Sequence, residues 1–123
     1  MDQEDLSLSG VMSEMDPELL AFLRKIDSFV KWDLISFFYD NPHTTDTAEN
    51  VARYAGRNAE TTKAELAELA KSGILLGNQL GDMTVYSLPH DPKTKELIRR
   101  FVESLDDRQF RVKAIYHIIH HMR

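Results

Sequence analysis

Three histidines close to the C-terminus are the residues whose type and spacing come nearest to metal chemistry. His117, His120 and His121 stand three and four positions apart, so one face of a helix can carry two imidazoles that share a metal ion. The chain contains no cysteine that could add a thiolate ligand. We therefore expect surface histidines without a bound ion, no metal site and no cofactor.

Catalytic motifs are missing from the sequence. The absence of cysteine excludes a thiol nucleophile, a thiolate metal site and a disulfide framework. The sequence has no phosphate-binding glycine loop and no metalloprotease helix, and its Ser, His and Asp residues form no recognisable nucleophile motif. The pattern predicts a protein that is not an enzyme.

Charge is distributed unevenly along the 123 residues. The whole chain has a net charge of −5, yet residues 1–20 hold six acids and no base, while the remainder holds 14 acids and 15 bases. Residues 1–15 show no stable hydrophobic period, so we expect an acidic, flexible arm before a near-neutral domain. The start lacks the features of a secretory signal, and no apolar stretch reaches the ~20 residues of a membrane span. This predicts a cytoplasmic protein with no membrane partner.

Two short helices are predicted in the middle of the chain. A capping box that starts at Asp46 precedes a helix over 47–55, which stops at Gly56. Asn58 can cap a second helix over 59–72. Two short helices separated by about three residues that include glycine have the spacing of a helix-turn-helix.

The flanking segments predict further helices and a hairpin. Helical spacing over 17–40 indicates one helix, or two with a break near Ser28. Turn residues at Gly81-Asp82, followed by an alternating run of β-formers, indicate a β-hairpin. Helical spacing resumes over 92–122, as one bent helix or as two helices broken at Asp106-Asp107.

A spaced set of residues runs through the turn, the second helix and the hairpin. Its members are Ala55-Gly56, Asn58-x-x-Thr61, Leu66-x-x-Leu69-x-x-x-Gly73-Ile74-Leu75 and Gly81-x-x-x-Val85-Tyr86-x-Leu88. From about Phe29 to Leu88 the chain resembles the small winged helix-turn-helix transcriptional regulators of the ArsR and MarR type. The resemblance implies a mainly α fold with a small β-hairpin wing, whose first strand begins at Ile74. It also implies a winged helix domain over 16–90 with an added N-terminal helix, and C-terminal helices over 91–123.

The resemblance further implies that helix 59–72 enters the major groove of double-stranded DNA. The groove-facing candidates are Arg57, Asn58, Glu60, Thr61, Lys63 and Ala64. An Asn side chain can read adenine, a Thr can contact a base edge or a phosphate, and Lys63 and Arg57 can neutralise phosphates.

Several charges depart from the family's pattern. Residues 74–88 contain no Lys or Arg, and residues 45–73 hold four bases and five acids. Because each missing phosphate contact lowers affinity, an alternative is a winged helix that binds another protein and not DNA. In a second alternative, the charged residues of helix 59–72 form only a solvated face of the helix. These residues are Glu60, Lys63, Glu65, Glu68 and Lys71.

The last helix has a wide apolar stripe, which suggests burial on two sides. We expect a symmetric homodimer through the C-terminal helices, with contacts from Phe110, Val112, Ile115, Tyr116 and Ile119. The alternative is that these helices only cover the core of their own chain.

A further hypothesis is that the acidic arm folds over the basic residues 89–123, which hold eight bases and five acids.

Overall fold

Each helix in the described part of the chain, residues 15–122 of the computed structural model, begins at a short polar side chain. These side chains accept a hydrogen bond from a backbone N–H of the first helical turn, which the helix itself leaves unpaired. The six caps are Asp16, Ser28, Thr47, Asn58, Asp91 and Asp107. The helices are α1 (Pro17–Leu23), α2 (Phe29–Asp40), α3 (Ala48–Ala55), α4 (Ala59–Lys71), α5 (Pro92–Ser104) and α6 (Arg108–His121).

Two long helical patterns are each divided into two helices. Ser28 caps α2, so residues 17–40 form two helices with a break near Ser28, which is one of the two forms predicted. Asp107 caps α6 in the same way, after the backbone has left α5 at Leu105. Of the two forms predicted for 92–122, the broken one is therefore observed.

The strands form a three-stranded antiparallel sheet in the order β1-β3-β2, with β1 at Asp46–Thr47, β2 at Leu76–Leu80 and β3 at Met83–Ser87. The predicted hairpin is confirmed, and its turn falls at Gly81, whose φ of 65° favours glycine. The prediction that its first strand begins at Ile74 is wrong. The backbone N–H groups of Ile74 and Leu75 donate to the Leu69 carbonyl and complete the end of α4, so the ladder begins at Leu76.

The capping box predicted at Asp46 is also wrong, by one residue. Asp46 lies in β1 opposite Tyr86, and its carboxylate accepts hydrogen bonds from the Thr47 N–H and the Asn50 side chain. The Thr47 hydroxyl instead caps α3 by accepting the Asn50 N–H. Pairing with β3 thus takes Asp46 into the sheet and moves the helix start to the next residue.

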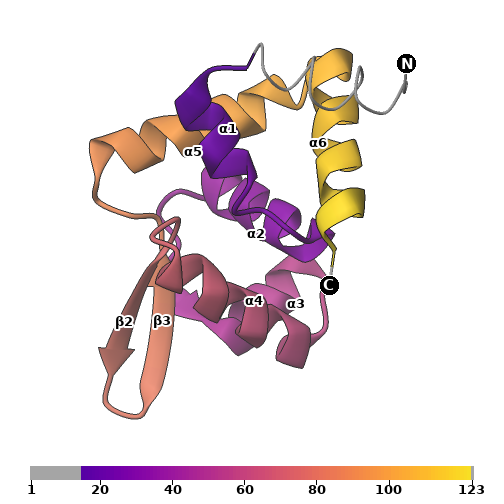
Figure 1. Ribbon diagram of the computed structural model, residues 1–123. Coiled ribbons are helices and arrows are strands. Elements are labelled where there is room, and N and C mark those ends of the chain that lie inside the picture. Colours follow the sequence, from indigo (N-terminus) through magenta and orange to yellow (C-terminus); the bar gives the residue numbers. More distant parts are fainter. Residues whose placement is uncertain (1–14, 123) are drawn as a thin grey trace.

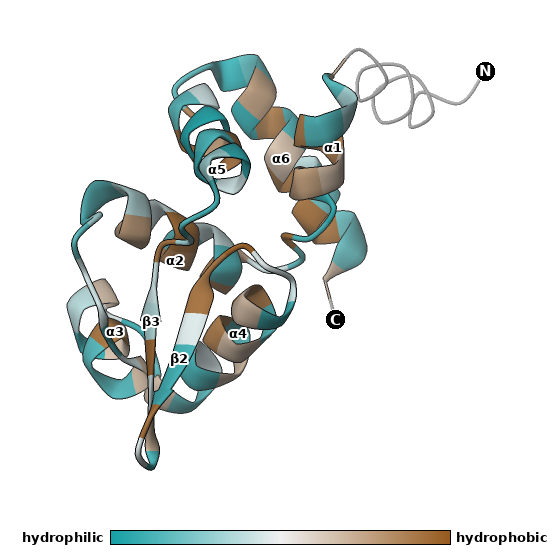
Figure 2. Cartoon of the chain, turned by 90° about the vertical axis from the view of Figure 1, so that its left-hand side faces the viewer, coloured by the Kyte–Doolittle hydropathy of each residue, from teal (hydrophilic) through white to brown (hydrophobic). Residues whose placement is uncertain are grey.

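The α2 helix lies between two groups of elements (Figure 1). On one side are α1, α5 and α6, and on the other are α3, α4 and the hairpin, an arrangement that the hydropathy view also shows (Figure 2). The rings of Phe22, Phe101 and Phe110 join α1, α5 and α6, with centroids 5.9 and 6.2 Å apart. One hydrophobic core runs through both groups. Every helix between residues 15 and 122 is too short or too polar to cross a membrane.

Candidate functional site

A tight turn of three residues, Gly56 to Asn58, connects α3 to α4. Gly56 has a φ of 68°, the left-handed conformation that ends α3, and the Arg57 N–H returns to the Ala52 carbonyl at 2.9 Å. The Asn58 side chain then accepts the Thr61 N–H at 3.0 Å and starts α4 at once. The turn therefore holds the first residues of α4 at the protein surface.

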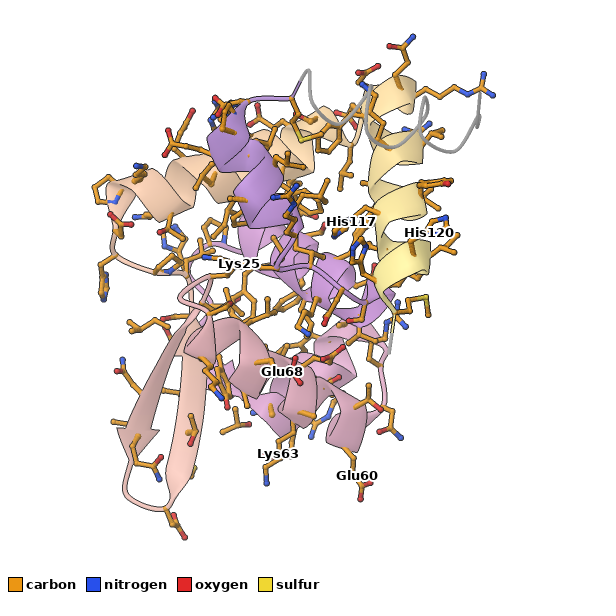
Figure 3. All side chains as sticks on the ribbon, in the orientation of Figure 1. Lys25, Glu60, Lys63, Glu68, His117 and His120 are labelled. Carbon is orange, nitrogen blue, oxygen red and sulfur yellow. The ribbon has the colours of Figure 1, made fainter. Side chains whose placement is uncertain are left out.

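All six residues predicted to contact DNA are exposed: Arg57, Asn58, Glu60, Thr61, Lys63 and Ala64. Figure 3 shows Glu60 and Lys63 pointing away from the body of the molecule at the start of α4. The opposite side of α4 places Thr62, Leu66 and Leu69 in the interior. The exposed set thus lies on a helix whose other side is fixed by the core.

The exposed residues divide between two flanks of α4. Lys63 lines a hollow of about 170 Å³ between α4, the start of α3 and the hairpin, together with Glu49 and Asp82. Thr61 and Ala64 line another hollow of about 410 Å³, which Met122 at the end of α6 also borders. A ligand that lay along α4 would therefore meet the hairpin on one flank and the end of α6 on the other.

Two of the predicted contact residues already have partners in the chain. The Asn58 carbonyl oxygen is used by the helix cap, whereas reading adenine uses both the oxygen and the amide nitrogen. Arg57 forms an ion pair with Asp33 of α2. A phosphate would have to compete with Asp33 for Arg57, and an adenine would have to compete with the Thr61 N–H for Asn58.

The surface around Lys63 carries more acid than base and is partly apolar. Glu49 and Asp82 lie beside this lysine. At the tip of the hairpin Leu80 and Met83 are exposed and face each other across the two strands. The hairpin thus offers apolar contact in place of the cations expected of a wing.

An ion cluster, buried at Lys31 and Glu65 and partly exposed at Asp27 and Glu68, fastens α4 to α2. The Lys31 side chain is 3% exposed, and its ammonium lies 2.5 Å from Asp27, 3.1 Å from Glu65 and 2.7 Å from Glu68. Burial opposes the charge of Lys31, but hydrogen bonds to the three carboxylates outweigh it and raise the pKa of this lysine above its usual value. Both Glu65 and Glu68 belong to this cluster. The alternative that placed them on a solvated face is wrong for Glu65, whose side chain is 8% exposed, while the Glu68 side chain is 43% exposed.

Sequence reasoning missed this cluster because its members come from α2, the linker before it and the distant α4. The spacing of Asp27 and Lys31, four residues apart, was a local signal. Glu65 and Glu68 lie more than thirty positions further along the chain, and nothing local showed which side of α4 would turn toward α2.

The residues predicted to form a dimer interface separate into two sets. Phe110 is buried against Phe101 within its own chain. Val112 and Ile119 are 55% and 58% exposed, and Ile115 and Tyr116 are half-buried. Helical spacing places these last four on one side of α6, which we call the outer face of α6.

The three C-terminal histidines do not converge on one point. The expectation of surface histidines is wrong for His117, which is 2% exposed. Its ring stacks on His121 at 4.3 Å, while the exposed His120 packs on Tyr116 at 4.2 Å (Figure 3). Among residues 15–122 no group of three or more His, Asp and Glu side chains is arranged to hold a metal ion. Burial lowers the pKa of His117, and the nearby His121 and Arg24 lower it further, against the opposite effects of the Leu23 carbonyl and Asp27.

Comparison with protein-family models and with curated proteins found no match to this chain. A similar solved structure is that of a "possible transcriptional regulator" from Methanosarcina mazei Go1. The two share 14% sequence identity with a TM-score of 0.54, over 77% of this chain and 82% of the other. At this identity the likeness shows a shared fold: mainly helical, with a small antiparallel sheet.

Proposed function

We propose that this protein is a winged helix transcriptional regulator that binds double-stranded DNA by inserting α4 into the major groove. The observation that carries the proposal is the exposed start of α4. It presents Glu60, Thr61, Lys63 and Ala64 to solvent, directly after a tight turn and beside an antiparallel hairpin. The two flanks of α4 would face the two walls of the groove, with Lys63 near one backbone and Thr61 near the other. The architecture shared with the neighbour from Methanosarcina mazei agrees with a regulator of this kind.

The proposed DNA-bound form is a symmetric homodimer. The outer face of α6 leaves Val112 and Ile119 more than half exposed, and a second copy can cover these side chains. A two-fold axis would place two α4 helices on half-sites about 34 Å apart, one turn of DNA. Phe110 is outside this proposed interface because it is buried in its own core.

The test measures fluorescence anisotropy of mixed genomic duplex fragments across a salt series. Thr61→Ala with Lys63→Ala should weaken binding, and loss of one phosphate contact should reduce the slope of log affinity against log salt by about 0.9 per protomer. Lys95→Gln is the matched control, because it removes one exposed lysine of α5 on the other side of α2. Equal affinity of the double variant and the control would refute the assignment of α4.

A second variant tests the same surface in the opposite direction. Asp33→Asn removes the partner of Arg57 and leaves the guanidinium available to a phosphate. We expect Asp33→Asn to raise DNA affinity and steepen the salt dependence. A gain here together with a loss in the double variant would show that the effects come from phosphate contacts and not from damage to the fold.

The partly apolar surface of the hairpin favours a second candidate, a winged helix that binds another protein. Leu80 and Met83 are exposed at its tip, and no cation lies between residues 74 and 88. This candidate predicts no salt-dependent DNA binding by the protein at low salt. It also predicts that a partner protein is recovered with the parent chain and with Lys63→Ala, and is no longer recovered with Leu80→Ser.

A further inference from the structure

The outer face of α6 combines exposed apolar side chains with cations at its start and along its two edges. Residues 108–121 contain Arg108, Arg111 and Lys113 but no Asp or Glu. Arg111 donates to the Leu105 carbonyl, whereas Arg108 and Lys113 enter no ion pair within the described residues 15–122. Helical spacing places Arg108 one turn before Val112, in line with the exposed apolar side chains.

The cations of two such helices in contact would offset part of the gain from burying their apolar side chains. In a two-fold dimer through this face, neither α6 supplies a carboxylate to pair with the cations of the other. An occupant that offers both acidic and apolar side chains complements the face better than a bare second copy.

Residues 1–14 have that composition. They contain four acids and no base, and they intersperse the apolar residues Leu6, Leu8, Val11 and Met12. They precede Met15, which packs on the core, and Asp16, whose carboxylate lies 3.0 Å from Arg100 of α5. Asp16 is thereby held close to α5, the helix that leads directly into α6.

We infer that residues 1–14 bind the outer face of α6 in the same chain, with their acids beside Arg108 and Lys113 and their leucines on Val112 and Ile119. The length is sufficient, because 14 extended residues span about 46 Å while the 14 residues of α6 span about 21 Å. Tethering favours this contact, since a short linker gives an effective concentration on the order of millimolar. The bound segment would cover the face through which the proposed homodimer forms. Competition with the dimer therefore rests on the proposed function, whereas the contact between residues 1–14 and α6 does not.

The test uses a spin label on the full chain. Because the chain has no cysteine, Ser7→Cys creates one unique thiol for a nitroxide. Amide signals of ¹⁵N-labelled protein are then compared with the label oxidised and reduced, at low concentration and without DNA. We expect strong signal loss at Val112 and Ile119 and weaker loss along α4, whose start borders the end of α6. Unchanged α6 signals, or equal loss along α4, would overturn the inference.

Charge variants provide the controls. Replacing the four acids by their amides (D2N, E4Q, D5N and E14Q together) should restore the α6 signals, as should Arg108→Gln with Lys113→Gln. Lys95→Gln, which removes a cation from α5, should leave the signal loss intact. High salt should reduce the loss, because the screening length falls from about 8 Å at 0.15 M to about 3 Å at 1 M. Insensitivity to both the variants and salt would count against the contact.

A mixed sample separates binding within one chain from binding between chains. Spin-labelled protein without ¹⁵N is added to ¹⁵N-labelled protein without the nitroxide. The inference predicts full signals for the ¹⁵N-labelled chains, because each α6 is covered by its own segment. Signal loss only in the mixed sample would overturn binding in the same chain.

Discussion

At the scale of single residues, Asn58 has two competing uses. Its side-chain oxygen accepts the Thr61 N–H and caps α4, and the resemblance to DNA-binding regulators assigns the same side chain to base reading. The substitutions available at this position can separate the two uses, because aspartate keeps the accepting oxygen and loses the amide donors.

We expect Asn58→Ala to lower the free energy of unfolding by about 1 kcal/mol, the usual contribution of such a cap. Asn58→Asp should keep most of this stability, since an N-terminal carboxylate also interacts favourably with the helix dipole. Urea denaturation of both variants measures the difference. If both lose the same amount of stability, the amide donors of Asn58 and not its oxygen hold the start of α4.

At the scale of elements, α6 is attached to α1 through a buried histidine. His117 packs among residues of the core, and the carbonyl of Leu23 at the end of α1 favours its proton. Its surroundings contain His121, Arg24 and Asp27 as titratable or charged groups. Burial dominates among these effects, so the charged imidazolium is disfavoured in the folded state.

Stability should therefore decrease in mild acid. The pKa of His117 is lowered on folding from about 6.5, so the unfolded chain binds more protons below that pH. The full contribution is present above pH 6.5 and is lost as the pH falls through the pKa of the folded state. Thermal melts from pH 8 to pH 5 should show a falling melting temperature in the parent chain and a flatter profile in His117→Leu.

His120→Gln is the matched control, because it removes an exposed histidine of the same helix and leaves His117 in place. The pKa values of Asp16, Asp46 and Asp91 are also lowered on folding, but they affect stability at lower pH. The stability that these carboxylates contribute is lost only below about pH 4. A decline that begins only below pH 4 in the parent chain would contradict the role given to His117.

Local signals predicted most of these elements, and tertiary pairing explains the errors. Helix starts and turns depend on atoms within three residues, so a local sequence pattern predicts them. Examples are the helix caps Asn58 and Asp91 and the turn at Gly81. The strand at Asp46 forms only because Tyr86 lies opposite it, forty residues away. In the candidate site, the exposed positions of α4 are those that the resemblance implied, whereas the partners of Arg57 and Lys31 depend on how α2 packs.

At the scale of the whole molecule, charge and apolar surface are separated. The α4 side carries more acid than base around Lys63, with Glu49 and Asp82 beside it, while α6 on the other side of α2 is basic and partly apolar. DNA binding by one copy should therefore be weak, because few phosphates are neutralised. Two copies joined through α6 would combine two weak contacts into one stronger interaction.

The dimer is tested by placing a charge on the outer face of α6. Ile119 is 58% exposed, so covering its exposed part is worth about 1–2 kcal/mol, twice in a two-fold interface, and Ile119→Glu should raise the dissociation constant of the dimer on the order of 100-fold. Sedimentation equilibrium measures this constant, and Thr45→Glu, at an exposed position outside α6, is the control. DNA affinity should fall with the dimer in Ile119→Glu and persist in Thr45→Glu. Dimers that survive in Ile119→Glu would place the interface elsewhere, and undiminished DNA binding by its monomers would show that α4 acts without a second copy.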